Sequence, residues 1–216
     1  MARAGRPEVM PDLLGNRQPI ATALWPLRGV VAADAIRAVV LIALGIVLLT
    51  LSAKISVPLP MVPMTLQTLV VLVIGAAYGW RLGVATVLGY LAVGAAGVPV
   101  FAGPFGGLAP LFGATAGFLF GFVVAAFLTG VLGARGWDRS IIHMFLALAI
   151  GHVVILAMGL AWLAYGRQLG LEKAWAVGVG PFLAGAVVKT LLGALLVPGL
   201  RALADRRRID NGGIIG

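Results

Sequence analysis

Lys189 is a charged side chain deep inside a long apolar block of this sequence. It stands about eight residues after Pro181, so a helix that begins there carries it about 12 Å from its start. If the block spans a membrane, a charge at that depth usually faces a cavity and serves a function; snorkelling toward the interface is the alternative. The predicted helices contain no acidic residue. Lys189 is therefore neutral, bonds backbone carbonyls, or meets a ligand that is anionic or rich in acceptors, and we favour the ligand.

The rest of the sequence offers little for catalysis or for metal binding. Cysteine is absent, which excludes thiolate chemistry and cysteine metal sites. His143 and His152 are the two histidines, and such membrane histidines are more often hydrogen-bond partners between helices. Gly180 and Gly185 have the spacing of a phosphate-binding loop, but Ala186 stands where that loop needs lysine. We therefore expect no catalytic residue, no metal, no cofactor and no enzymatic activity.

Aromatic and polar side chains gather where the apolar blocks meet two irregular loops. Rings at these positions suit the wall of a pocket for a flat bicyclic ligand, although each alone is more often a packing residue; the candidates are Tyr90, Phe101, Phe105, Phe118 and Phe182. Gln67 opens an apolar block with no capping role, so we expect it to face the ligand. Thr65 either caps that block or joins the site. Thr115 bonds either a ligand or its own helix backbone.

The scaffold that positions these residues is predicted to lie in a membrane. Of the 216 residues, 61% are hydrophobic and 11% are charged, whereas soluble domains are about 25% charged. A spanning helix needs about 20 mostly apolar residues, and six blocks qualify: residues 36–53, 66–78, 82–96, 111–132, 141–165 and 177–200. We therefore predict an all-α integral membrane protein with six transmembrane helices.

The basic residues indicate the orientation of these helices. With the N-terminus inside, the outer side carries only Lys54, Arg167 and Lys173, and the inner side carries Arg28, Arg37, Arg81, Arg135, Arg139, Arg201, Arg206, Arg207 and Arg208. This asymmetry follows the positive-inside rule and places both termini in the cytoplasm. The net charge of +9 is thus explained without a nucleic-acid partner. We expect a flexible cytoplasmic arm at residues 1–35, a transmembrane domain at 36–200 and a basic cytoplasmic tail at 201–216.

Two outer loops, residues 54–64 and 97–110, carry no charge after Lys54. Prolines exclude regular helix from the first loop, and the second is rich in glycine. Irregular apolar backbone at membrane depth must be buried in protein or line a cavity. We predict that these loops, between helices one and two and between helices three and four, form a lid over the ligand. A re-entrant packing element is the alternative.

The acidic residues bear on the energy source for any transport. All seven lie outside the predicted helices, whereas secondary carriers use intramembrane acids to couple protons or sodium. Without an ATP-binding loop either, the chain is a passive facilitator or one subunit of a machine whose motor is elsewhere. A structural subunit without a ligand is a further alternative, and a channel is disfavoured because no polar face runs along any predicted helix.

Four stretches carry a resemblance to a known family: residues 55–68, residues 89–103 with Gly106 and Gly107, residues 113–122, and residues 181–189. In this order they resemble the BioY family, the biotin-specific S components of energy-coupling-factor (ECF) vitamin transporters. The last stretch departs from the family pattern at Ala184 and Ala186, where the family has proline and aspartate. Lys189 therefore lacks the carboxylate that the family places beside its lysine.

The resemblance implies a multi-pass protein of the bacterial plasma membrane that binds biotin from the outside, as a transported ligand and not a cofactor. Its implied partners are a transmembrane coupling subunit (T component) and a pair of cytoplasmic ATPases. The alternative within this class is an S component for thiamin or riboflavin. The residues expected to contact the ligand are Lys189, Gln67, Thr65, Tyr90, Phe101, Gly103, Phe105, Gly106, Gly107, Thr115, Phe118 and Phe182.

Overall fold

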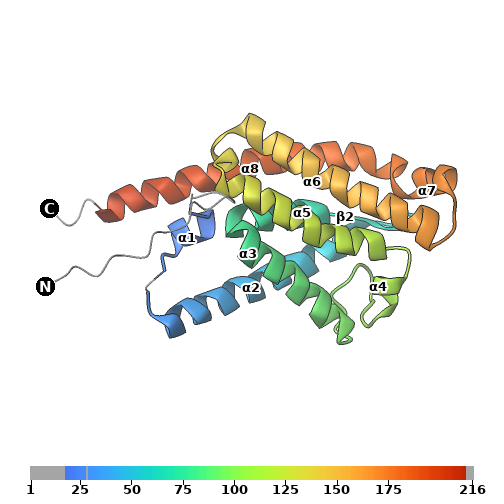
Figure 1. The fold of residues 1–216 in the computed structure, drawn as a ribbon, viewed down its shortest axis with the longest axis horizontal. Helices are drawn as coiled ribbons and strands as arrows, with labels where there is room; N and C mark the ends of the chain where they lie inside the picture. Colours follow the sequence, from blue (N-terminus) through green and yellow to red (C-terminus); the bar gives the residue numbers. More distant parts are fainter. Residues whose placement is uncertain (1–17, 28, 213–216) are drawn as a thin grey trace, which may run out of the picture.

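The computed structural model describes residues 18–27 and 29–212, with side chains described up to residue 207. It is a bundle of long helices (Figure 1). The α-helices are α1 Ile20–Leu24, α2 Val31–Lys54, α3 Gln67–Ala95, α4 Ala109–Phe112, α5 Ala116–Ala134, α6 Ile141–Ala161, α7 Leu171–Gly178 and α8 Leu183–Gly212. The shorter elements are strands β1 Ser56–Val57 and β2 Met64–Thr65, 3₁₀ turns η1 Trp137–Arg139 and η3 Gly180–Phe182, and the π-helical turn η2 Trp162–Gly166.

Five helical stretches of the described residues are long and apolar enough to cross a membrane: Val31–Lys54, Gln67–Ala95, Ala116–Ala134, Ile141–Gly166 and Leu171–Arg207. The most apolar window of the α5 stretch is 67% buried inside the protein, whereas that of α2 is 28% buried. Figure 1 agrees with this difference, because α5 lies between its neighbours and α2 lies at the lower edge of the bundle. The prediction of an all-α membrane protein is confirmed.

The stretch Gln67–Ala95 is a helical hairpin rather than one straight helix. Gly79 interrupts it with φ 78° and ψ 165°, a conformation that glycine adopts without a steric penalty. A Cβ atom built on Gly83 would lie 3.0 Å from Gly75 Cα. The Gln67 Nε2 atom lies 2.7 Å from the Tyr90 hydroxyl, whereas a straight helix would separate these residues by about 35 Å. The separate helices predicted at 66–78 and 82–96, with a tight turn between them, agree with this reversal.

Several predicted boundaries differ from the observed ones. The helix expected at 111–132 is broken around Gly113, so that α4 precedes the break and α5 starts at Ala116. The helix expected at 177–200 begins after the η3 turn at Leu183 and continues through Pro198 to Gly212. Part of the expected tail at 201–216 is thus helical. The first outer loop lacks helix as predicted, and its ends pair as an antiparallel β1–β2 ribbon.

The expected flexible arm at 1–35 also differs where the structure describes it. Helix α1 buries Ile20 and Ala21, and α2 already begins at Val31. The Arg37 side chain donates hydrogen bonds to the Trp25 carbonyl at 2.6 Å and to the Thr22 hydroxyl at 3.2 Å. This segment therefore packs on the bundle, while residues 1–17 lie outside the described residues.

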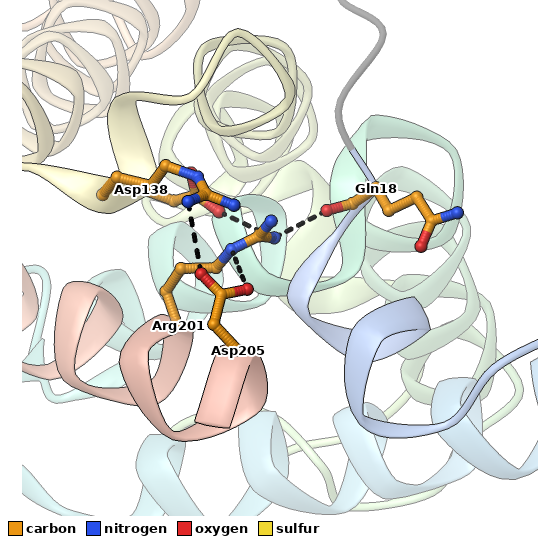
Figure 2. A network of polar contacts seen from close by, with 5 residues as sticks. Gln18, Asp138, Arg201 and Asp205 are labelled. Atoms are coloured by element: carbon orange, nitrogen blue, oxygen red, sulfur yellow. Dashed lines mark hydrogen bonds and ion pairs between the residues drawn. The ribbon is translucent and has the colours of Figure 1, made fainter. Parts of the chain in front are cut away.

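Arg201 on α8 is the buried centre of a polar network at the α1 end of the bundle (Figure 2). Its Nη1 donates to the Gln18 carbonyl at 2.7 Å and lies 3.4 Å from an Asp138 carboxylate oxygen. Asp205 pairs with Arg201 at 3.3 Å and with Arg139 at 3.2 Å. Burial raises the pKa of Asp138, and the nearby Arg201 opposes that rise. The network joins the N-terminal segment, the η1 turn and α8.

The exposures of these ion pairs predict unequal contributions to stability. Arg201 and Asp138 have side-chain exposures of 7% and 3%, so Arg201→Met leaves a buried carboxylate without its cation. We expect the free energy of unfolding in detergent to fall by about 3–5 kcal/mol. Arg139→Met is the matched control because its pair with Asp205 is 46% and 35% exposed, and it should cost at most about 1 kcal/mol. Equal losses would contradict the assigned role of Arg201.

Candidate ligand-binding site

A cavity of about 310 Å³ is lined in part by residues of α4. Helices α4 and α1 lie at opposite ends of the bundle (Figure 1). The size of the cavity suits a small organic ligand. Both irregular loops contribute to its wall, together with α3, α5, α6 and α8. The lining residues are Met61, Val62, Pro63, Thr65, Gln67, Thr68, Phe101, Ala102, Phe105, Ala109, Pro110, Gly113, Ala114, Thr115, Phe118, Leu119, Phe122, Ile155, Leu156, Phe182 and Lys189.

Lys189 lies on the cavity wall, and its side chain is largely buried. Its ammonium donates to the Thr65 carbonyl at 2.8 Å and to the Thr68 hydroxyl at 3.0 Å. No ion pair to Lys189 occurs within the part of the chain that the structure describes. An ammonium group has three donors, so a third remains for a ligand. Bonding to a backbone carbonyl, one of the alternatives that the sequence offered for Lys189, is therefore observed. It does not prevent Lys189 from also donating to a ligand.

His152 lies behind Lys189 and joins three helices. Its Nδ1 atom lies 3.1 Å from the Leu148 carbonyl and 2.9 Å from the Thr190 hydroxyl, and its Nε2 atom lies 3.3 Å from the Thr68 hydroxyl. A carbonyl only accepts, so in the neutral ring Nδ1 donates and Nε2 accepts the Thr68 proton. The Thr68 oxygen then accepts from Lys189. The expectation that a membrane histidine bonds between helices is confirmed for His152, whereas His143 is exposed and its ring packs edge-on against Trp137.

Gln67 and Tyr90 connect the cavity wall to the second loop. Gln67 Nε2 lies 2.7 Å from the Tyr90 hydroxyl, which donates to the Val100 carbonyl at 3.0 Å. The hydroxyl proton is committed to that carbonyl, so the Gln67 amide nitrogen must be the donor to Tyr90. The Gln67 side-chain oxygen therefore remains an acceptor. Gln67 lines the cavity, whereas the fully buried Tyr90 lies behind the wall and supports it.

The aromatic walls come from three parts of the chain. Phe118 and Phe182 stack with ring centroids 5.8 Å apart and planes inclined by 24°. Phe101 packs edge-on against Tyr90 at 5.5 Å. Phe105 lines the cavity although 60% of it is exposed. These four phenylalanines of the predicted site thus share one cavity, which is mainly apolar.

The remaining predicted residues divide into two groups. Thr65 and Thr115 line the cavity, and the Thr115 hydroxyl bonds the Pro110 carbonyl at 2.9 Å. Gly103, Gly106 and Gly107 are not among the lining residues. Positive φ angles of 69° at Gly103 and 80° at Gly107 indicate that these glycines shape the loop instead, because other residues rarely adopt such angles.

Several lining residues were not predicted from the sequence. Thr68 follows Gln67 directly, and its polarity within an apolar block was a usable signal. Met61, Val62 and Pro63 belong to the first irregular loop, so the lid prediction covered the segment but not the residues. Ile155 and Leu156 lie in α6, which is apolar all round apart from two histidines, so no periodicity separates a cavity face from a lipid face.

Fold and site together define a multi-pass helical membrane protein with a mainly apolar cavity and a buried lysine at one end of its bundle. The model of the BioY family matches residues 21–206, and the chain belongs to this family. It is 37% identical to the probable biotin transporter BioY of Pyrococcus horikoshii over 161 residues, which are 74% of this chain and 94% of that protein. It is 38% identical to the biotin transporter BioY of Rhizobium etli over 169 residues, covering 75% and 87% of the two chains.

A solved structure has the same fold. The crystal structure of the S-component for biotin from an ECF-type ABC transporter aligns with a TM-score of 0.69 at 21% sequence identity. The alignment covers 81% of this chain and 95% of that chain. The helical bundle therefore has the same fold as that S-component.

The contacts of Thr68 predict a measurable cost of losing its hydroxyl. Thr68→Val keeps the shape but removes an acceptor from Lys189 and a partner from His152. We expect the free energy of unfolding in detergent to fall by about 1–3 kcal/mol, because a buried charged donor loses an acceptor. In the control Thr86→Val, the lost hydroxyl bonds only its own helix at Leu82, so the loss should be smaller. A larger loss at Thr86 would refute this assignment.

Proposed function

We propose that this chain takes up biotin as the substrate-binding S component of an ECF-type transporter. The observation that carries the proposal is the cavity itself, where Lys189 and Gln67 are polar groups in a mainly apolar wall. Relatives that are named biotin transporters support the choice of ligand. Thiamin and riboflavin are the competing ligands of the same class.

Biotin has chemical features that match this wall. Its thioether ring is apolar and suits the stacked Phe118 and Phe182. Its ureido group carries N–H donors, for which the free Gln67 oxygen is an acceptor. Lys189 supplies a donor to either the carboxylate or the ureido oxygen. Because Ala186 has no carboxylate, the positive charge of Lys189 is available to the ligand.

The transport arrangement follows from the same proposal. Six spans with both termini in the cytoplasm put the cavity on the outer side of a bacterial plasma membrane. The spans occupy the domain at residues 36–200, and the arm at 1–35 and the tail at 201–216 face the cytoplasm. A T component and two cytoplasmic ATPases provide the coupling and hydrolyse ATP, so the chain itself is not an enzyme. Biotin, these subunits and lipid are its partners, and nucleic acid is not.

The direct test is equilibrium binding of labelled biotin to the purified chain in detergent. We expect saturable binding that unlabelled biotin displaces and that neither thiamin nor riboflavin displaces. Displacement by thiamin or riboflavin would reassign the ligand within the class. A folded sample that binds none of the three would refute self-sufficient vitamin binding.

Lys189 gives the mutational prediction of this proposal. Lys189→Ala should weaken biotin binding by about 10-fold or more, since a hydrogen bond from a charged donor contributes about 1.5–3 kcal/mol. The fold should persist because no acid is left unpaired by the change. The control Lys173→Ala removes an exposed lysine of α7 and should leave the dissociation constant unchanged. Unchanged affinity in a folded Lys189→Ala variant would remove Lys189 from the site but not biotin from the cavity.

A further inference from the structure

Lys54, the last residue of α2, has a set of contacts that the binding cavity alone does not explain. Its ammonium nitrogen lies 2.7 Å from the Pro99 carbonyl, 2.7 Å from the Phe101 carbonyl and 2.6 Å from the Gly103 carbonyl. An ammonium group has three donors. All three therefore go to one short piece of chain in the second outer loop.

That piece of chain belongs to residues 97–107, which we call the lid segment. The Val100 carbonyl accepts from Tyr90, between the Pro99 and Phe101 carbonyls that accept from Lys54. Tyr90 therefore holds the middle one of three consecutive carbonyls, and Lys54 holds the two that flank it. Two side chains thus satisfy four carbonyls of a segment without regular backbone pairing.

The lid segment forms part of the cavity wall through Phe101, Ala102 and Phe105. The Phe101 ring packs on Tyr90 at 5.5 Å and occupies the space that a side chain at Gly94 would need. Its backbone carbonyl is one of the three that Lys54 holds. The position of this wall residue is therefore coupled to Lys54, which itself does not line the cavity.

The two anchors of the lid segment differ in their access to solvent. Tyr90 is fully buried, so breaking its bonds would leave buried polar groups unsatisfied. Lys54 is exposed, and water can solvate its ammonium when the bonds break. Gly97 and Gly103 have φ angles of 101° and 69°, and the freedom of glycine allows the chain to move there. Opening of the lid segment is therefore easiest on the Lys54 side.

We propose that Lys54 is a positioning residue that holds the lid segment closed over the cavity and slows the release of bound ligand. This proposal rests on the proposed biotin-binding function. Lys54 acts on the wall through the backbone, so its loss changes how long the ligand stays more than how the ligand is recognised. Such changes appear mainly in the dissociation rate constant.

The test compares association and dissociation rates of labelled biotin for the full chain in detergent. Lys54→Met keeps the length of the side chain and removes every donor. We expect dissociation to accelerate by about 10-fold or more while association changes by less than about 3-fold. Lys54→Arg keeps the charge and the donors and should restore most of the slow dissociation. Lys173→Met, an exposed lysine of α7, is the control and should match the wild type.

Amide hydrogen exchange without ligand gives a second readout. In Lys54→Met, the amides of residues 97–107 should exchange about 10-fold faster, whereas those of α5 should not change. Unchanged dissociation in the variant would overturn the role of Lys54 and leave biotin binding intact. If the wild type binds no biotin, the proposed function fails. Whether Lys54 holds the lid segment closed is then decided by hydrogen exchange alone: unchanged exchange of residues 97–107 in Lys54→Met would overturn it. If Lys54→Met does not fold, Lys54→Gln, with two neutral donors, must show intermediate dissociation or exchange.

Discussion

Backbone carbonyls outside regular helices need donors, and this requirement organises the cavity end of the molecule. Irregular chain at membrane depth is tolerated only where it is buried in protein or lines a water-filled cavity. Helix side chains supply donors to three of these segments. Lys189 donates to Thr65, Lys54 to three carbonyls of the lid segment, and Trp162 to Gly113 at 2.8 Å. The same bonds that permit irregular backbone therefore position the wall of the cavity.

Charged side chains have different kinds of partner at the two ends of the bundle. At the α1 end, Arg201 meets Asp138 and Asp205, and opposite charges neutralise one another. At the cavity end, Lys54 and Lys189 meet neutral carbonyls and hydroxyls, and their charge is not cancelled. A cavity end with uncancelled positive charge suits a ligand that carries a carboxylate. The ion pairs at the α1 end instead join segments that are distant in sequence.

How well the sequence predicted the role of a residue depends on the type of residue. Long apolar blocks predicted the helices because lipid demands length and hydrophobicity along the whole span. Lys189 and Gln67 were predicted because polar side chains are costly in such blocks. Tyr90 was expected on the wall, but its hydroxyl satisfies Val100 and its ring lies behind Phe101. Lys54 appeared only as an outer charge, since the sequence does not say where a flexible four-carbon side chain ends.

The sequence by itself determined the membrane class, the helical blocks, the irregular loops and the family, because each depends on composition or on motifs read along the chain. Only the tertiary structure decided which loop carbonyls meet Lys54, that Thr68 links Lys189 to His152, and that Ile155 faces the cavity. It also decided that residues 18–25, before α2, contact Arg37 and Arg201. These contacts join residues far apart in the chain, and their partners depend on how the helices rotate and pack, which a uniformly apolar sequence does not encode locally.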